Sequence, residues 1–247
     1  MHTWLIGVDD TDMPDTRGTG HLARAIADEL ASQGYTPAGI TRHQLLVHPD
    51  IRYTSHNSAN CLEVAASEDH GTVLFAWACQ FVAGRSPQGA DPGVCVARKA
   101  QVGGEARRFG LRAQAEVLDM DEARRVAASE GHLLAGLAGT EIGVIGALAA
   151  VGLRAGGEDG RFIGLGSIRD LAGRVRVQEI LDAGIAALEA PDGVVPRPGD
   201  WVETFGWVRP RLRGGRPVLL VQRSDQDGVD WLVCDRRTGP DKRAASA

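Results

Sequence analysis

The chain has 247 residues, of which 43% are hydrophobic and 24% are charged, and its formal net charge is −5. These fractions are those of a globular protein and exclude wholesale disorder, and the length allows one large domain or two modest ones. The acidic balance excludes a protein that coats nucleic acid with its whole surface, while it allows a local basic patch.

The first hundred residues predict elements in the order β-α-β-β-α-β. Leu22, Ile26 and Leu30 recur at intervals of four, as on one face of a helix, and Gly34 follows as a helix C-cap. Short apolar runs bounded by polar, proline or glycine residues predict the strands. The predicted strands are 3–8, 43–48, 61–66 and 93–97, and the predicted helices are 19–33 and 72–83. This order is typical of a ferredoxin-like split βαβ unit, over about residues 1–98.

The remaining residues predict a second α/β portion and then a small β unit. The second portion has a strand at 115–118, a helix at 121–130 with Asp121 as its N-cap, a helix at 142–153 and a strand at 161–165. Residues 190–200 carry three prolines and predict a linker, and short strands follow at 201–208, 217–222 and 229–234. We therefore expect an α+β fold with an ATP-binding catalytic region at 1–190, a small β unit at 200–235 and a disordered tail at 236–247.

The four cysteines form no pattern typical of a metal site or a disulfide framework. They lie far apart and include no C-x-x-C pair, which excludes a zinc ribbon. The N-terminal residues lack the basic and apolar segments of a signal peptide. The longest uncharged apolar run, 142–153, is shorter than the about 20 residues that span a bilayer. We therefore expect a cytoplasmic protein with no membrane partner.

Three carboxylates follow the first predicted strand, in the sequence GVDDTD. Asp9, Asp10 and Asp12 lie so close that they disfavour one another's ionisation unless a cation compensates. Mg²⁺ is the usual cation, since it takes one or two carboxylates and leaves its other positions to phosphates and water. The sequence therefore predicts a magnesium site. The alternative is a turn in which the aspartates cap the next helix.

Gly18, Thr19, Gly20 and His21 open the first predicted helix. Glycines at a helix N-terminus let backbone N–H groups approach an anion closely, so this segment predicts a phosphate cradle beside the carboxylates. No Gly-Lys-Ser/Thr phosphate loop is present. The separation between the strand and Gly18 is also too long for the tight turn of a Rossmann fold.

Three further segments carry candidate ligand contacts. The loop 49–61 is dense in hydrogen-bonding side chains, among which we single out His56 and Asn57. Gly143 and Gly146 open the helix at 142–153, where a second anion cradle and close helix packing are equal alternatives. Lys99 is the single lysine of residues 1–241, which are otherwise rich in arginine. It is either a phosphate contact or present by chance.

Aromatic residues alternate with arginines between 197 and 216. The aromatic members are Trp201, Phe205 and Trp207. Such a pattern binds nucleic acid by stacking and charge in many proteins. The alternative is a small β core with a solvated basic turn.

Four segments follow one another within the first 165 residues: MHTWLIGVDDTD, LVHPDIRYTSHNSA, DPGVCVA and GVIGALAAVG. In the same order they resemble V-G-I-D-D-T-D, L-N-P-x-I-P-x-K-T-R-G-N, N-P-G-x-x-V and G-I-I-G-A-L-A-A-I-G of the archaeal agmatidine synthases, which modify the anticodon cytidine of an isoleucine tRNA. The resemblance implies an ATP- and Mg²⁺-dependent catalytic domain beside a ferredoxin-like domain. In that family ATP phosphorylates the cytosine carbonyl, and agmatine displaces the phosphate. Its metal- and ATP-binding acids and its glycine elements fall on Asp9, Asp10, Asp12, Gly18, Gly143 and Gly146.

Some positions depart from the family pattern. His21 stands where the family has its phosphoryl-accepting threonine if no gap is allowed, and Thr19 stands there if two residues are deleted. The tripeptide Thr-Ser-His at 54–56 replaces Lys-Thr-Arg, and Ile142 replaces an arginine. These departures make the identity of the acceptor the least determined part of the resemblance.

The sequence therefore predicts an ATP- and Mg²⁺-dependent phosphoryl-transfer or ligase-type enzyme that acts on a small-molecule or nucleobase-like acceptor. The candidate catalytic residues are Asp10, His21 and His56, and the candidate cofactor-binding residues are Gly18, Thr19, Gly20, Asn57, Gly143 and Gly146. Two alternatives stay open. One is an RNA (tRNA) modification enzyme that binds RNA through its C-terminal unit, and the other is a non-catalytic nucleotide-binding sensor.

Overall fold

The computed structural model of the chain describes residues 2–54, 56–66 and 69–234. The predicted disordered tail at 236–247 lies outside these residues. The chain divides into two compact units. The first unit comprises Met1–Leu165 and Leu212–Arg216, and the second comprises Gly166–Arg211 and Pro217–Ala247. These bounds differ from the predicted division into 1–190 and 200–235.

An antiparallel sheet forms the centre of the first unit. Its strands are β1 (His2–Asp9), β2 (Thr36–Gln44), β3 (Ser58–Ala66), β4 (Gly93–Arg98), β5 (Leu133–Gly136) and β6 (Arg161–Gly164). They lie in the order β5-β4-β1-β3-β2-β6, so that β1 has a neighbour on each side. In this order β3 lies between β1 and β2, as in a split βαβ unit.

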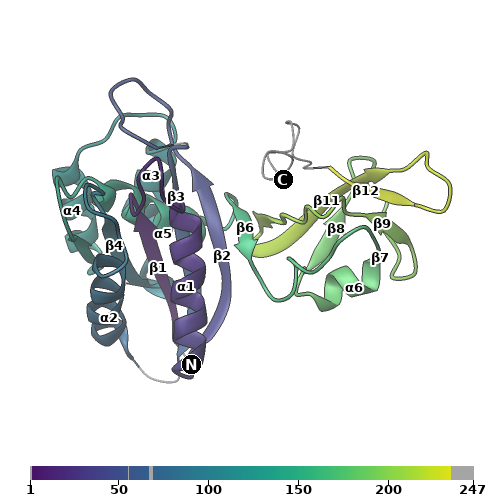
Figure 1. Ribbon diagram of the computed structural model, residues 1–247, viewed down its shortest axis with the longest axis horizontal. Coiled ribbons are helices and arrows are strands. Elements are labelled where there is room, and N and C mark those ends of the chain that lie inside the picture. The colour runs from purple at the N-terminus through teal and green to yellow at the C-terminus, as the bar shows by residue number, and fades with distance from the viewer. Residues whose placement is uncertain (1, 55, 67–68, 235–247) are drawn as a thin grey trace. The chain divides into compact units, whose positions relative to one another are not determined.

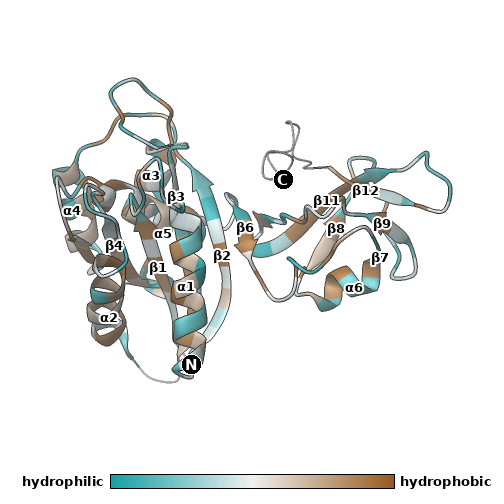
Figure 2. Cartoon of the chain, viewed as in Figure 1, coloured by the Kyte–Doolittle hydropathy of each residue, from teal (hydrophilic) through white to brown (hydrophobic). Residues whose placement is uncertain are grey.

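Helices cover both faces of this sheet. The first helices are α1 (Thr19–Ser32) and α2 (Gly71–Ala83), and the later ones are α3 (Gly104–Arg112), α4 (Met120–Ser129) and α5 (Gly143–Gly156). Side chains of β1 alternate between two cores: Trp4 and Ile6 pack with α1 and α2, whereas Leu5 packs with α3, α4 and α5. Figure 1 shows α1 lying along the sheet. In Figure 2, α2 is hydrophobic over most of its length, whereas α1 carries both hydrophilic and hydrophobic stretches.

Glycine brings α5 unusually close to β1. A Cβ atom on Gly7 would lie 2.1 Å from the carbonyl oxygen of Ala147, so only glycine at this strand position admits the helix backbone. The helix is buried along most of its length, with Leu148 and Val151 fully inside the core. This close approach places the first turn of α5 beside the carboxyl end of β1. The acidic segment, residues 9–12, begins there.

Several predicted elements differ from those in the structure. Strand β2 ends at Gln44 rather than running from 43 to 48, and it includes a bulge between Pro37 and Ile40 that hides the strand in the sequence. Residues 115–118 form no strand. Helix α3 is absent from the prediction because it has few large apolar residues, and strand β5 is absent because it is only 4 residues long. The N-cap of α4 is Asp119, which accepts from the N–H of Glu122, rather than Asp121.

The second unit is a small β structure with one helix. It contains β7 (Arg174–Arg176), α6 (Val177–Asp182), β8 (Ala187–Glu189), β9 (Trp201–Glu203), β11 (Arg216–Arg223) and β12 (Trp231–Val233), and β10 (Arg211–Arg213) spans a boundary between the units along the chain. Strand β9 pairs with β7 and β12, and β11 pairs with β12 and β8. Trp231 is fully buried in its core. No helix among the described residues is long and apolar enough to cross a membrane.

Candidate functional site

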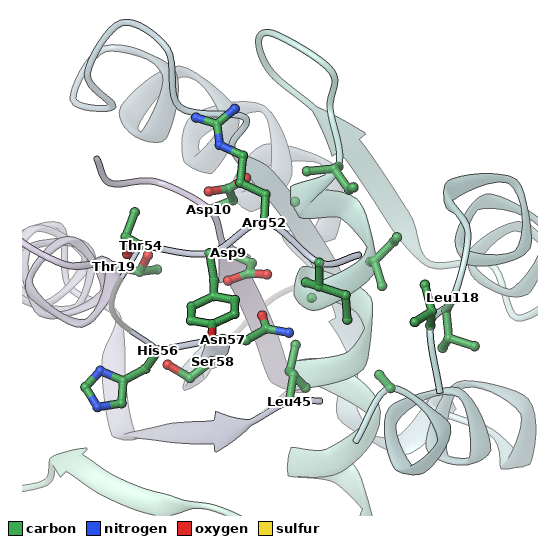
Figure 3. Close-up of a pocket in the computed structure, with 18 of the residues that line it drawn as sticks. Asp9, Asp10, Thr19, Leu45, Arg52, Thr54, His56, Asn57, Ser58 and Leu118 are labelled. Atoms are coloured by element: carbon green, nitrogen blue, oxygen red, sulfur yellow. The ribbon is translucent and has the colours of Figure 1, made fainter. Parts of the chain in front are cut away.

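A pocket opens at the carboxyl end of β1, within the first unit. Its cavity volume is about 110 Å³. Its wall comes from four segments: the acidic segment and the start of α1, the loop 45–58, residues 113–118, and the first turn of α5. In Figure 3, Asp10 and Arg52 lie together at one end of this pocket, and Leu118 lies at the opposite side. The pocket therefore has a charged end and an apolar wall.

Two carboxylates stand at the charged end with raised pKa values. Burial raises the pKa of Asp9 to about 7, and the neighbouring Asp10 carboxylate contributes to the rise. Burial and the Asp91 carboxylate raise the pKa of Asp10 to about 6, although Arg52 opposes the rise. Asp10 also adopts a left-handed backbone conformation, with φ of 51°, which aspartate tolerates better than most residues. Both groups thus lack enough positive charge nearby to hold them ionised at their ordinary pKa.

Asp12 accepts hydrogen bonds from two hydroxyl groups. Thr19 donates to one carboxylate oxygen at 2.7 Å, and Thr54 donates to the other at 2.9 Å. This chain of hydrogen bonds ties the start of α1 to the loop 45–58 across the pocket. The Thr19 side chain is therefore a hydroxyl held by a carboxylate, which is the arrangement of a polarised hydroxyl group.

Arg52 and Asp91 form a second link across the charged end. Arg52 Nη1 lies 3.4 Å from a carboxylate oxygen of Asp91, and Nη2 donates to the carbonyl oxygen of Gly89 at 3.2 Å. The other Asp91 oxygen accepts from the N–H of Thr140. Asp91 is almost fully buried, whereas the Arg52 side chain is 65% exposed. Arg52 is the one arginine or lysine among the described residues that line the pocket.

Asp91 is a site residue that the sequence motifs did not single out. A signal is present, because Asp91 precedes Pro-Gly at the start of β4, in a segment similar to a family motif. Its proximity to Asp10 depends on the pairing of β4 with β1, which the sequence does not reveal.

One wall of the pocket is apolar. Its members are Leu45, Ala113, Val117, Leu118, Ile142 and Ile145. A pocket with an apolar wall and a few convergent polar groups is typical of sites for small molecules and cofactors.

The glycines of α5 serve close packing. A Cβ atom on Gly143 would lie 2.5 Å from the backbone nitrogen of Gly93, and its own N–H donates to the carbonyl oxygen of Asp91. A Cβ atom on Gly146 would lie 1.8 Å from a carboxylate oxygen of Asp9. Both residues line the pocket, but the N–H of Gly143 is already occupied. Between the two alternatives, the geometry favours packing over an anion cradle.

The structure brings some of the other predicted residues into the pocket and not the rest. His56 and Asn57 line it, together with the three aspartates and Thr19. His21 lies outside the lining residues; its exposed ring is 2.8 Å from a guanidinium nitrogen of Arg17. Asn57 donates to the carbonyl oxygen of Leu46, so its amide also shapes the loop. Gly18 is the N-cap of α1, and Gly20 packs near Ile163 rather than into the pocket.

Other polar candidates belong to buried networks outside the pocket. Lys99 donates at 2.9 Å to Glu63, which also accepts from the buried Arg154, so the lone lysine has a structural partner. His43 is fully buried between Thr41 and Asp159. Across the described part of the chain, no three His, Cys, Asp or Glu side chains gather closely enough to hold a metal ion by themselves.

Comparison with known proteins supports the resemblance found in the sequence. No family model matches the chain. Over 80 residues the chain is 39% identical to the 2-agmatinylcytidine synthetase TiaS of Methanocorpusculum labreanum, an enzyme named for an isoleucine tRNA. The match covers 32% of this chain and 18% of that protein. The chain resembles tRNA agmatidine synthase in this region.

Solved structures extend the likeness to the fold. The crystal structure of TiaS in complex with tRNA and ATP is 25% identical, with a TM-score of 0.54, and the match covers 62% of this chain and 36% of that one. A tRNA fluorescent labelling enzyme matches with 25% identity and a TM-score of 0.53 over 61% of this chain and 36% of its own. The complex of TiaS with tRNA, AMPCPP and agmatine shares the fold over 81% of this chain and 52% of its own, at 19% identity and a TM-score of 0.54. The chain thus spans about a fifth of the curated relative, and between about a third and a half of these solved ones.

Proposed function

We propose that the chain binds ATP with Mg²⁺ in the pocket at the end of β1 and transfers a phosphoryl group to an oxygen of a nucleobase-like acceptor. The observation that carries this proposal is the juxtaposition of Asp9 and Asp10, whose pKa values are raised by burial and by neighbouring carboxylates, with the hydroxyl chain Thr19–Asp12–Thr54. The likeness to a protein solved in complex with ATP and tRNA supports it. A ligase-type reaction would follow if an amine then displaced the phosphate from the acceptor.

Each polar residue has a distinct role in this proposal. Arg52 stands where it can neutralise phosphate charge, because its guanidinium is exposed to the pocket beside Asp10. Within residues 18–21, Thr19 lines the pocket, whereas His21 does not. Asp12 accepts a hydrogen bond from the Thr19 hydroxyl and holds it in place. The apolar wall near Leu118 receives a base. Catalysis then depends on positioning and charge neutralisation more than on a protein base.

The residues present fit a magnesium ion that shares its coordination with phosphates. Burial first, and neighbouring carboxylates second, raise the pKa values of Asp9 and Asp10, and a bound cation would favour their ionised forms. Mg²⁺ is commonly held by one or two carboxylates plus phosphates and water, so a cage made wholly of protein groups is not required. Asp9 and Asp10 would hold the ion, which would neutralise phosphate charge when bound. Asp12 is engaged by its two threonines and would orient rather than coordinate.

Replacing Asp10 by asparagine tests this proposal. We expect Asp10→Asn to weaken the binding of ATP in the presence of Mg²⁺ by about 10- to 100-fold at pH 8, because a charged contact to the ion is lost while the shape is kept. Isothermal titration calorimetry measures the affinity. Asp15→Asn is the matched control, since Asp15 is an exposed acid of the same segment outside the pocket. Wild-type affinity in Asp10→Asn would contradict the assignment.

A second candidate function is the modification of RNA, with RNA held in part by the second unit. Two guanidinium groups there lie over partly exposed tryptophan rings, Arg176 over Trp201 at 3.7 Å and Arg209 over Trp207 at 4.1 Å. Phe205 is exposed beside them in sequence. Aromatic rings and arginines together bind single-stranded nucleic acid through stacking and charge. The likeness to proteins solved with tRNA supports this candidate.

The RNA candidate predicts a salt-dependent interaction. We expect Phe205→Ala to weaken the binding of a single-stranded oligoribonucleotide by about 5- to 100-fold, the range for loss of one stacked base. Fluorescence anisotropy at several salt concentrations measures the affinity, which should fall as salt rises. Val195→Ala, which removes an exposed apolar side chain of the same unit, serves as the control. If RNA binding depends neither on Phe205 nor on the salt concentration, this candidate function is wrong. The proposal of a nucleotide site in the pocket is not affected by that result.

A further inference from the structure

Helix α2 differs from the other helices of the first unit in its charge. It has no charged side chain in its 13 residues, Gly71–Ala83. A helix that is hydrophobic nearly all round is normally buried on every side. One side of α2 is buried, because Leu74, Ala78 and Val82 pack into the core. The opposite side is exposed to solvent, although Figure 2 shows hydrophobic residues along most of the helix.

The exposed side of α2 forms one continuous stripe without charge, which we call the α2 stripe. The intervals of three and four between its residues place them on one face of the helix. Val73 is 61% exposed, and the partly buried Trp77 borders the stripe. Depletion of charged residues is the compositional mark of the centre of a protein–protein interface. The residues of the stripe are Thr72, Val73, Ala76, Gln80 and Ala83.

The exposed faces of the neighbouring helices are those of an ordinary surface. Helix α1 exposes Asp28. Helix α3 exposes Arg107 and Arg108, and α4 exposes Arg124 and Arg125. The absence of charge on the α2 stripe is therefore specific to this helix, in a chain of which 24% is charged.

A second copy of the chain is the partner that fits the α2 stripe. Residues 235–247, which lie outside the described part of the chain, contain no large apolar residue. They therefore have no side chain suited to lie on Val73 or Trp77. A second copy presents the same stripe, and most homo-oligomers are twofold dimers in which one patch meets itself.

Two exposed charges of opposite sign flank α2. Asp69 lies just before the helix and Arg85 just after it, at equal separations from Trp77 along the chain. The Arg85 guanidinium lies over the Phe81 ring, 3.6 Å from its centroid, and the Phe81 and Trp77 rings are 4.9 Å apart. Neither charge is paired with an opposite charge among the residues that the structure describes. One end of the α2 stripe is thus acidic and the other is basic.

This distribution of charge fits an antiparallel copy. When two α2 helices lie side by side in opposite directions, the acidic end of each meets the basic end of the other. Their helix dipoles then also attract each other. A parallel arrangement would bring like charges together, which is unfavourable. A twofold axis perpendicular to the helices, near Trp77, produces the antiparallel arrangement.

We propose that the chain forms a twofold dimer through the α2 stripe, with the two α2 helices antiparallel and Asp69 of each copy near Arg85 of the other. The 13 residues of α2 span about 20 Å, so one pair of helices gives a small interface and a dimer that dissociates in the micromolar range. The stripe lies outside the residues that line the pocket, so the dimer does not depend on the proposed function.

Sedimentation velocity of the full chain, from about 1 to 200 μM, measures this association. We expect the mean mass of the wild type to rise from that of one chain toward that of two. Val73→Asp places an uncompensated charge at two symmetric positions of the interface and should weaken the dimer by about 100-fold or more. Leu111→Asp is the matched control, since Leu111 is 59% exposed on α3, and it should associate like the wild type. Both positions are exposed, so both variants should keep the thermal unfolding of the wild type.

Charge reversal tests the antiparallel direction. Arg85→Glu brings like charges together at both ends of the interface and should weaken the dimer by about tenfold. Adding Asp69→Arg to this variant restores opposite charges, so the double variant should regain the association of the wild type. A double variant that stays as weak as Arg85→Glu would overturn the proposed direction.

Three outcomes of the sedimentation experiment would overturn the dimer. A mass of one chain at every concentration would leave the α2 stripe to a different protein. Equal weakening by Val73→Asp and Leu111→Asp, or a dimer that neither substitution weakens, would place the interface elsewhere. If ATP binding in the presence of Mg²⁺ still depends on Asp10 in these cases, the proposed function stands and only the dimer is lost.

Discussion

Replacing Gly143 by alanine is expected to destabilise the first unit by about 3 kcal/mol or more, the upper range for overpacking a closely packed interior. The added Cβ would lie 2.5 Å from the nitrogen of Gly93 and 2.6 Å from the carbonyl oxygen of Asp91. Both atoms belong to the backbone and cannot rotate away. The start of α5 would have to separate from β4, and the hydrogen bond from the N–H of Gly143 to Asp91 would be lost. Unfolding in guanidinium chloride measures the change.

The same helix offers a control for this substitution. Gly156 ends α5, and nothing lies within 4 Å of its Cβ position. Alanine there is expected to stabilise the protein by up to about 1 kcal/mol, because it raises helix propensity without a clash. If Gly143→Ala instead kept full stability and lost only ATP binding, the glycine would be an anion cradle and the packing assignment would be wrong.

Asp9→Asn is expected to stabilise the ligand-free protein by about 4 kcal/mol at pH 8 and to abolish Mg²⁺-dependent ATP binding. The pKa of Asp9 is raised from 3.8 to about 7, so the folded protein holds a proton that the unfolded chain releases. The stability contributed by that proton is fully present below about pH 4 and is lost as the pH rises through about 7. An asparagine at this position remains neutral throughout, so the variant avoids this loss.

Thermal unfolding between about pH 5 and pH 8.5 measures this prediction, because the interval spans the raised pKa of Asp9. The wild type should lose stability across the interval, and Asp9→Asn should lose less. The Asp15→Asn control should follow the wild-type curve, since Asp15 is exposed and outside the pocket. A variant that is less stable than the wild type at pH 8 would show that the Asp9 carboxylate is compensated in the folded protein.

Local patterns predicted the parts of the site that lie close together in the chain. The strand before Asp9 and the helix after Gly18 are continuous apolar or periodic runs, so the sequence places the aspartates and Thr19 at one end of the sheet. His21 lies near the acids along the chain, but it is not among the residues that line the pocket. Two residues along a helix turn a side chain by more than half a circle, so Thr19 and His21 cannot both face the pocket.

Contacts between segments that lie far apart in the chain could not be predicted from the sequence. Arg52 meets Asp91 because β4 pairs with β1 and the loop 45–58 folds back over their ends. No periodicity encodes a strand order, and the short β5 that completes the sheet has too few large apolar residues to show a pattern. The partner of Lys99 is hidden for the same reason, since Glu63 lies on a different strand.

Titration of the wild-type chain with ATP, with and without Mg²⁺, tests the central claim most directly. We predict binding that requires Mg²⁺ and releases protons near pH 7, because Asp9 and Asp10 must ionise to accept the ion. Repeating the titration in buffers of different ionisation enthalpy counts those protons. Binding that is equally strong without Mg²⁺ and releases no protons, or no binding at all, would contradict a nucleotide site built on these two carboxylates.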